Sequence, residues 1–407
     1  MPSIASIRAR FPGLSGSTVL LDNAGGSQLP ASVIEAMAAY MRGSFVQTGA
    51  GYALSQRAGE TVAAAHAWVN RIVGGEAVGS VILGPSSTQL CHLLAGCYRS
   101  RLAPGDEIVI AECGHEANIG PWVALERQGV VIRWWRAGDD PTGCPLAALD
   151  TLLGPRTRLL CVPHASNLLG GVVDVAEVTR RAHAVGARVV VDGVAFAPHR
   201  PMDVAAWGCD WYIHSTYKVY GPHMGALFGR HEAIAELDGP NHYFIPRTSV
   251  PYVFELGGAC HEGCAGLLGL REHLAFLAGS DQAPADVDRA TTVRAFEAMA
   301  ELEAPLQRRL VEGLSRLPGV RIIGPPTFGP ERVATVSFVH ERVPSRTIAA
   351  QAHRRDIGIR HGHAYAHRLV KALGLDPDDG VVRISAVHYS TLEEIDQALD
   401  AVKEAIG

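Results

Sequence analysis

The stretch Trp211-Tyr-Ile-His-Ser-Thr-Tyr-Lys218-Val-Tyr-Gly-Pro-His223 places a lysine among aromatic and apolar residues, directly after a strand-like run. Burial and nearby cations favour the neutral amine of a lysine over its ammonium form. The neutral amine is the form that attacks an aldehyde to make a Schiff base. The stretch therefore indicates a catalytic lysine, although a lysine in isolation is more often amphipathic, with its charge reaching solvent.

An acid upstream offers this lysine a chemical partner. Val189-Val-Val-Asp192-Gly ends a β-branched run on a carboxylate. Sites for pyridoxal phosphate (PLP) need both groups, a lysine for the imine and an acid that keeps the ring nitrogen protonated. Asp192 alone is equally consistent with a cap or turn at a strand end, so the hypothesis rests on the pair.

Composition sets the outer limits of the function. The chain has 407 residues, of which 47% are hydrophobic and 19% charged, enough for a major domain and a smaller one. A net charge of -5 argues against nucleic acid or an anionic membrane as the main partner. No apolar run approaches the roughly 20 residues of a membrane span, and no secretory signal is visible, so we expect a cytoplasmic protein.

The eight cysteines are scattered, most of them in apolar runs. This usage is typical of reduced core residues. Cys260, His261 and Cys264 lie close together, but no second ligand pair has the spacing of a zinc site, so no metal is expected.

Short β-branched or apolar runs alternate with helix-length segments. This alternation predicts an α/β fold with a mainly parallel sheet. The expected strands are residues 80–83, 107–110, 130–135, 158–162, 187–191, 210–214 and 226–228, with helices over 87–99, 118–128, 146–153 and 173–184. A long helix over 287–314, kinked or divided at Pro305, leads to a smaller region with strands within 332–339, 357–360 and 381–385 and a final helix over 391–406.

Polar residues fall where the expected strands of the larger region end, and ligands on parallel sheets collect at such ends. Ser87 and Thr88 open a helix whose free N–H groups would hold a phosphate, although hydroxyl residues are also ordinary helix caps. His115 would either stack on a cofactor ring or merely form a hydrogen bond within its loop. The segment that contains Asn167 could also be only a turn that ends in glycine. Together with Asp192 and Lys218 they predict one cofactor site.

Two motifs, Val189-Val-Val-Asp-Gly-Val-Ala-Phe-Ala-Pro-His199 and Ser215-Thr-Tyr-Lys-Val-Tyr-Gly-Pro222, resemble those of PLP-dependent enzymes of aminotransferase class V, near the cysteine desulfurase and selenocysteine lyase branch. The resemblance runs from Leu20-Leu-Asp-Asn-Ala-Gly-Gly26 to the last helix. It implies PLP-dependent transferase fold type I, with a mainly parallel seven-stranded sheet and a smaller C-terminal α/β domain. The implied units are an N-terminal arm (1–20) packing with the small domain, a large PLP-binding domain (21–285) and a small domain (286–407).

The resemblance also implies roles for single residues. Lys218 becomes the Schiff-base lysine, Asp192 the partner of the pyridine nitrogen and His115 the residue stacked on the ring. The remaining implied cofactor contacts are Ser87, Thr88 and Ser215 to the phosphate, Asn167 to the ring oxygen or substrate, and Tyr217.

Substrate and subunit contacts follow from the same resemblance. Arg383, in Val381-Val-Arg-Ile-Ser385, would bind the substrate α-carboxylate through a two-point guanidinium fork. Asn23 and Arg360 are the other implied substrate contacts. The protein is expected to be a homodimer, with each site completed by the partner chain near Phe254-Glu-Leu-Gly-Gly258.

The loop Gly358-Ile-Arg-His-Gly-His-Ala-Tyr-Ala366 departs from the family pattern. Desulfurases carry there a cysteine that attacks the substrate sulfur and becomes a persulfide, and Tyr365 stands at its place. A phenol cannot carry a persulfide, so desulfurase action by that route is not expected. Tyr365 either acts as an acid or shapes the pocket. Ala195 and Gly258 also stand where the family usually has a glutamine and a threonine that contact the cofactor, and Tyr217 replaces a histidine next to the lysine.

The expected mechanism passes through an external aldimine of a small amino acid, from which the freed Lys218 amine removes the Cα proton. The carbanion then loses a Cβ leaving group, regains the proton on the other face, or passes it to C4′. The first hypothesis is a C–S β-lyase without a protein persulfide, and the alternative is an epimerase or aminotransferase. A cofactor-binding protein without turnover is disfavoured because Lys218, Asp192 and Arg383 occur together.

Overall fold

The computed structural model describes residues 2–407. Its main sheet has seven strands in the order β2-β8-β7-β6-β5-β3-β4. Strand β8 runs antiparallel to both of its neighbours, while the other pairs are parallel. The expected mainly parallel sheet is confirmed. The strands are β2 Gly79–Gly84, β3 Glu107–Ala111, β4 Val131–Trp135, β5 Thr157–Pro163, β6 Arg188–Asp192, β7 Trp211–Ser215 and β8 Gly225–Arg230.

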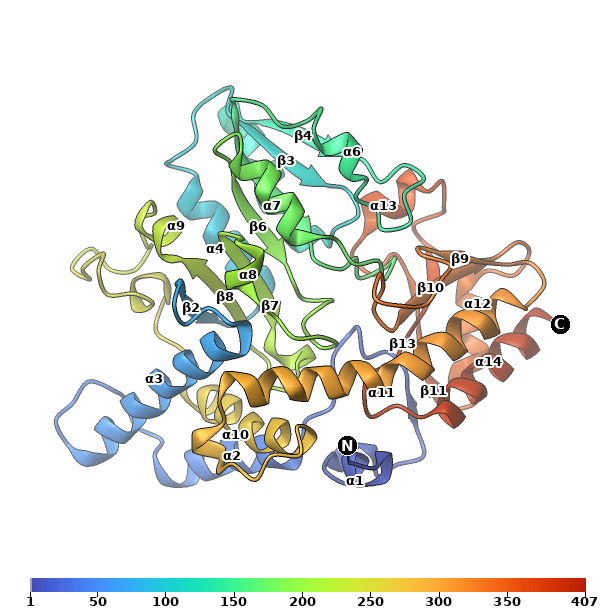
Figure 1. Cartoon of the computed structure of the whole chain (residues 1–407), viewed down its shortest axis with the longest axis horizontal. Helices are drawn as coiled ribbons and strands as arrows, with labels where there is room; N and C mark the ends of the chain where they lie inside the picture. The colour runs from blue at the N-terminus through green and yellow to red at the C-terminus, as the bar shows by residue number, and fades with distance from the viewer. Residues whose placement is uncertain (1) are drawn as a thin grey trace.

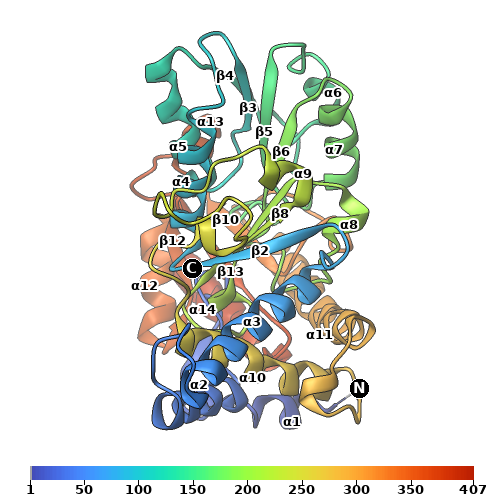
Figure 2. The same ribbon diagram turned by 90° about the vertical axis from the view of Figure 1, so that its left-hand side faces the viewer.

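Helices cover both faces of this sheet, because side chains alternate between two cores along each strand. Val189 and Val191 of β6 point into one hydrophobic core and Val190 into the other. Figure 2 shows α4 and α5 on one side of the strands and α6, α7 and α8 on the other. These helices span Ser87–Tyr98, Gly120–Val123, Leu146–Leu149, Val175–His183 and Val204–Trp207.

A further group of helices lies beneath the main sheet in the view of Figure 1. It contains α2 Ala31–Gly43, α3 Ala53–Val73 and α10 His261–Leu277, while the short α9 is His231–Ala235. From this group α11, Arg289–Ser315, extends to the smaller sheet. The expected division at Pro305 is wrong, since the helix continues through it. Met299 and Leu306, both buried on either side of the proline, supply packing that offsets its cost of about 3 kcal/mol.

The smaller sheet is antiparallel, in the order β12-β13-β10-β9, and a separate parallel pair joins β1 to β11. A capping box at Thr391 and Glu394 starts the final helix. The strands are β1 Val19–Leu20, β9 Val320–Ile323, β10 Thr335–His340, β11 Ile357–Gly358, β12 Arg360–Gly362 and β13 Val381–Ser385, and the helices are α12 Ser345–Arg354, α13 His367–Ala372 and α14 Leu392–Ile406.

The N-terminal segment, with α1 at Ile4–Arg8, contacts both regions of the chain. Arg8 pairs with Glu394 at 2.9 Å, and β1 pairs with β11. Phe11 instead packs edge-on against His273 of α10. The division into an arm and two domains at residues 20 and 285 stays a prediction.

One expected helix differs clearly from the structure. Residues 118–128 form two short 3-10 turns, Glu116–Asn118 and Ala124–Gln128, around the four-residue α5. Gly120 and Pro121 explain the break, because glycine weakens a helix and proline removes a backbone donor.

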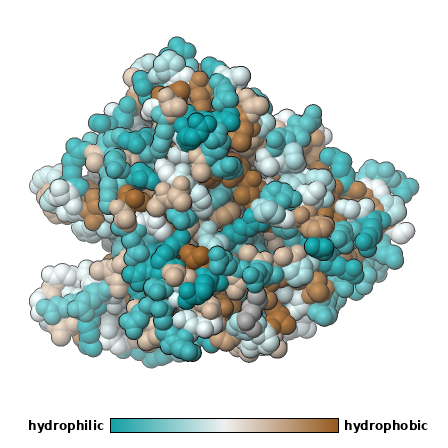
Figure 3. Space-filling model, viewed as in Figure 1, coloured by the Kyte–Doolittle hydropathy of each residue, from teal (hydrophilic) through white to brown (hydrophobic). Residues whose placement is uncertain are grey.

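Hydrophilic and hydrophobic residues are interspersed on the face shown in Figure 3. Within residues 2–407, no helix is both long and apolar enough to cross a membrane.

Candidate active site

Five chain segments bring polar side chains to the carboxyl edge of the main sheet. Strand β2 leads into Ser87, β3 into His115, β5 into Asn167, β6 ends on Asp192 and β7 leads into Lys218. The predicted meeting of these strand ends is confirmed by the shared lining of two adjoining cavities.

The first cavity, of about 490 Å³, lies over the strand ends. Its polar lining combines hydroxyls, imidazoles, acids and an amine, from Ser87, Thr88, His92, His115, Glu116, Asp192, Ser215, Tyr217 and Lys218. The second cavity, of about 600 Å³, shares His115, Tyr217, Lys218 and Tyr365 with the first and adds Asn167, Arg360 and Arg383.

Lys218 ends a 3-10 turn, Thr216–Lys218, that directly follows β7. Burial, with the nearby Arg383 guanidinium, lowers the pKa of Lys218 to about 8, against the opposing pull of Asp192 and Asp22. About a tenth of its amine is therefore neutral at pH 7, far more than for an ordinary lysine, and the neutral amine is the nucleophilic and basic form.

Asp192 is buried at the end of the central strand β6. Burial raises the pKa of its carboxyl, while a 3.0 Å hydrogen bond from Val194 N–H to Oδ1 and the Lys218 charge oppose the rise. A buried acid with so few donors is incompletely satisfied. A protonated ring nitrogen in the cavity would supply the missing partner.

His115 is held as a neutral ring. Its Nδ1 accepts a hydrogen bond from Ala117 N–H at 3.0 Å, which leaves the ring proton on Nε2. Burial, followed by the charges of Lys218 and Arg383, lowers its pKa to about 4. A neutral imidazole is suited to stacking on a cofactor ring.

Two hydroxyls lie together at the start of α4. Ser87 Oγ and Ser215 Oγ are 2.8 Å apart and buried. Helix α4 has twelve residues, so its free N–H groups and dipole add to an anion site. Strand β8 approaches so closely that a Cβ at Gly225 would lie 2.4 Å from Ser87 N, and glycine there leaves the cradle open.

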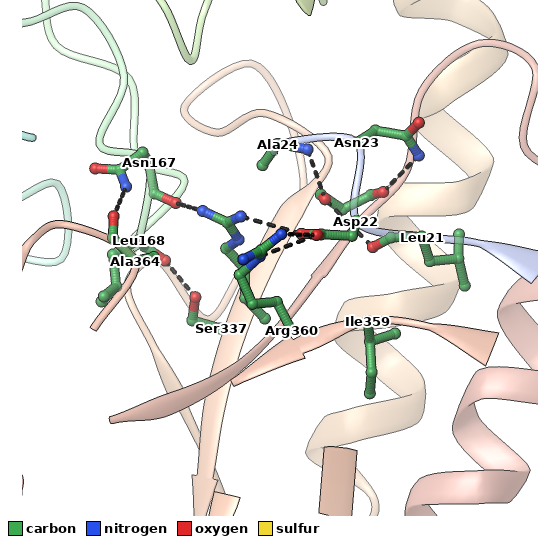
Figure 4. A network of polar contacts seen from close by, with 12 residues as sticks. Leu21, Asp22, Asn23, Ala24, Asn167, Leu168, Ser337, Ile359, Arg360 and Ala364 are labelled. Carbon is green, nitrogen blue, oxygen red and sulfur yellow. Dashed lines mark hydrogen bonds and ion pairs between the residues drawn. The ribbon is translucent and has the colours of Figure 1, made fainter. Parts of the chain in front are cut away.

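Arg383 and Arg360 face each other across β13 and β12, and Figure 4 shows the network around Asp22. Arg383 Nη2 donates to Asp22 Oδ1 at 3.2 Å and its Nη1 to the Asn167 carbonyl at 3.2 Å. Arg360 donates from Nε and Nη2 to Asp22 Oδ2, at 2.9 and 2.6 Å. Arg383 Nε is buried without a partner within residues 2–407.

The structure does not bring the side chain of Asn23 to either cavity. Its Nδ2 donates to the carbonyls of Leu20 and Ser385, and its Oδ1 accepts from the Tyr389 hydroxyl at 2.6 Å. The amide instead fixes the turn after β1. The residue that reaches the arginines is its neighbour Asp22.

Tyr365 covers the junction of the two cavities and is 66% exposed. Its ring centroid lies 5.1 Å from that of His115. The loop is fixed at its backbone, because Glu116 N–H donates to the Tyr365 carbonyl at 2.9 Å and Asn167 Nδ2 to the Ala364 carbonyl at 2.7 Å. Both Ala364 and Tyr365 have positive φ, a strained backbone conformation for such residues.

Sequence reasoning missed Asp22, Glu116 and Arg368. Glu116 accepts two 3.0 Å hydrogen bonds from Arg368 and so ties the Tyr365 loop to the segment after β3. The acids stand directly beside predicted site residues, Asn23 and His115, but their partners are distant in sequence. The position of these acids next to predicted site residues is the one feature of the sequence that could have pointed to them.

Seven of the eight cysteines are buried and all are free, which confirms the expected core usage. Of the residues that line the two cavities, Cys91 is the only cysteine. It is 1% exposed, and burial raises its pKa well above the ordinary thiol value. Cys91 is therefore held as a thiol, the poorly nucleophilic form.

Comparisons with known proteins agree with this arrangement. The model of the family described as aminotransferase class V matches residues 19–398. The aminotransferase-like protein FGM3 of Gibberella zeae is 35% identical, over 98% of both chains. A protein of Mycolicibacterium paratuberculosis described as a probable cysteine desulfurase is 31% identical over 98% of this chain, which spans 58% of that protein.

The fold is also that of solved structures. The cysteine desulfurase CsdA of Escherichia coli superposes with a TM-score of 0.83 at 26% identity, covering 100% of this chain and 99% of that one. This likeness confirms the fold type I expectation, with a seven-stranded mixed main sheet and a small C-terminal sheet.

Proposed function

Because the chain belongs to the aminotransferase class V family, a PLP-dependent family, we propose that it is a cysteine desulfurase-like enzyme that removes the Cα proton of a small amino acid and cleaves a C–S bond at Cβ. The observation that carries this proposal is the position of Lys218. Its partly neutral amine lines both the cavity of the buried acid and the cavity of the arginine pair.

The first cavity fits the proposed cofactor by the chemistry of its donors. Ser87, Ser215 and the start of α4 would bind the phosphate, Asp192 the ring nitrogen, and His115 the face of the ring. Bound PLP would supply an aldehyde for attachment to lysine and a ring that withdraws electrons from Cα.

The side chains of the second cavity would orient the amino acid. Arg383 lines it with an unpartnered, buried Nε, a donor suited to the α-carboxylate. The Lys218 amine, shared by both cavities, would take the proton from Cα. Tyr365 would cover the reacting atoms and limit the access of water, as an acid or as packing.

A protein persulfide is not part of the proposal. In this proposal Tyr365 takes the position of the loop cysteine, as the sequence resemblance implies, and Cys91 is buried in its thiol form. The substrate sulfur would leave as a free thiol or sulfide. The net reaction converts a cysteine-type amino acid and water into that thiol or sulfide, pyruvate and ammonium.

A panel of L- and D-amino acids in deuterated buffer tests the reaction. We expect Cα deuterium exchange together with pyruvate and a thiol or sulfide from substrates with sulfur at Cβ. Serine and alanine serve as matched controls, since they keep the Cα proton but lack the sulfur. Exchange without pyruvate from any substrate would contradict the lyase and favour the epimerase or aminotransferase, which D-isomer and keto-acid assays separate.

We further propose a homodimer with shared sites. Large apolar side chains are exposed on two segments, residues 45–52 and 243–256. Both segments project on the left side of the molecule in Figure 1 and flank the notch at the left of Figure 3. The exposed side chains are Phe45, Tyr52, Tyr243, Phe244 and Leu256. Exposed apolar patches of this kind mark interfaces. Sedimentation is expected to give twice the 43.3 kDa chain mass, and a monomer that stays catalytically active at assay concentration would contradict the proposal.

A further inference from the structure

Asp22 holds two arginines that the sheet forces together. Arg360 and Arg383 are direct cross-strand neighbours of β12 and β13. Like charges placed opposite each other destabilise a sheet. The single carboxylate of Asp22 contacts both guanidinium groups, through Oδ1 to Arg383 and Oδ2 to Arg360. One negative charge is therefore shared between two positive charges.

This sharing leaves one uncompensated positive charge at the second cavity. The side chain of Arg383 is 5% exposed, that of Asp22 24% and that of Arg360 52%, so solvent screens the charge of Arg383 less than that of Arg360. Arg383 Nε remains buried without a partner within the described chain. An unpaired buried donor on a cavity wall points to a ligand oxygen.

Lys218 also lines this cavity, which it shares with the first cavity, and the remaining charged groups lie towards the mouth. Asp378 and His361 line it but are exposed. Neither forms an ion pair with Arg360 or Arg383 among residues 2–407. Lys218 is the same in every variant compared below, so the differences in charge between these variants are set by the two arginines and Asp22.

The backbone of Gly25 passes close to the ion pairs of Asp22. A Cβ at Gly25, which lines the same cavity, would lie 3.1 Å from Asp22 Oδ2 and 3.4 Å from Arg360 Nη2. Glycine at this position leaves the arginine pair open to the cavity. The opening admits a ligand next to Asp22, whose own charge repels any second anionic group placed there.

We propose that Asp22 is a specificity-determining residue, which admits amino acids carrying only the α-carboxylate and rejects those with an acidic side chain. This inference rests on the proposed function, because it assigns the arginine pair to the substrate carboxylate. With Asp22 in place, one carboxylate neutralises the site. A second anionic group would meet the Asp22 carboxylate instead of a free guanidinium.

Calorimetric titration of the holoenzyme with propionate and with succinate tests the charge balance without turnover. In Asp22→Asn, the ratio of succinate to propionate affinity is expected to rise about tenfold or more, because one unit of charge changes within a few ångströms of the ligand. Asp22→Glu keeps the charge and is expected to keep the wild-type ratio.

A double variant separates charge from structure. Asp22→Asn with Arg360→Gln restores one net positive charge, so the anion ratio is expected to return towards the wild-type value. The matched control is Asp356→Asn, which removes an acid whose carboxylate, within residues 2–407, bonds only the Ser17 and Thr18 hydroxyls beside β1 and should leave the ratio unchanged.

An unchanged ratio in a folded Asp22→Asn protein, or no return in the double variant, would overturn the inference. Failure of the proposed function has a different signature. In that case the amino-acid panel shows no Cα exchange, while the anion ratio still responds to the charge at position 22.

Discussion

Lys218→Ala is expected to leave a folded protein that no longer retains PLP covalently and whose Cα exchange falls at least about 1,000-fold, the scale of a lost acid–base catalyst. The amine has no substitute in the cavities, because the chain has only three lysines. Lys371 on α13 and Lys403 on α14 are exposed and line neither cavity.

Borohydride reduction followed by peptide mass analysis measures this retention directly. In the wild-type protein the reduced cofactor is expected on the peptide that contains Lys218. The matched control is the double variant Lys371→Ala and Lys403→Ala, which should retain the same label. A label that persists in Lys218→Ala would contradict the assignment of the lysine.

The pH dependence of capture gives a second readout of the same amine. Only the neutral amine attacks the aldehyde, so capture is expected to rise with pH and to level off above about pH 8, the pKa to which burial and Arg383 lower Lys218. An ordinary exposed lysine would continue to gain reactivity towards pH 10.

The strands that carry candidate catalytic residues at their carboxyl ends were predictable from the sequence, because their sequence patterns are local. The β-branched run of β6 and its terminal Asp192 lie within five residues, and both the strand and its burial are found as expected. The same holds for β7 and Lys218. These positions carry the family motifs as well as the periodic pattern, so two kinds of evidence coincide.

Helix α10 was not predicted, for a reason visible in its packing. Its glycines lower helix propensity, yet they permit close contact with α2. A Cβ at Gly269 would lie 2.5 Å from the Ser32 carbonyl, and one at Gly266 would lie 2.7 Å from Met37 Cγ. Tertiary packing thus outweighs local propensity, and a single sequence does not reveal which helix will supply the contact.

The network around Asp22 was missed because its members are far apart in the chain. Asp22 and Arg383 are separated by 361 residues, and their meeting depends on β1 pairing with β11 and on an isolated bridge from Asp22 to Ser385. A two-residue strand has little periodic signal. The neighbouring Asn23 was chosen instead, although its amide is consumed by backbone and tyrosine contacts.

Asp192→Asn is expected to reduce Cα exchange about 100-fold or more, the scale on which removal of one preorganised charge or donor affects a rate. Asparagine keeps the size of the side chain and can still accept the bond from Val194 N–H. It carries no charge to keep a ring nitrogen protonated. Borohydride labelling of Lys218 should persist in this variant, since the lysine and the phosphate cradle are intact.

Whereas Asp192→Asn is expected to lower the rate of Cα exchange, it is not expected to lower the stability of the apoprotein. Burial raises the pKa of Asp192 in the folded state, so ionising this acid opposes folding, and the penalty grows as pH rises through the folded pKa. Asparagine removes the penalty at neutral pH, and the Tm of Asp192→Asn should be equal to or above that of the wild type.

Asp210→Asn provides the matched control, because Asp210 is an equally buried acid that is paired with Arg188 and His183. Removing its charge leaves Arg188, whose side chain is 27% exposed, with Glu236 as its remaining acidic partner within residues 2–407, and should lower Tm, with little effect on exchange per folded site. A lower Tm with unchanged exchange in Asp192→Asn would make Asp192 a structural acid like Asp210. Opposite effects on rate and stability are the signature of a charge retained for chemistry.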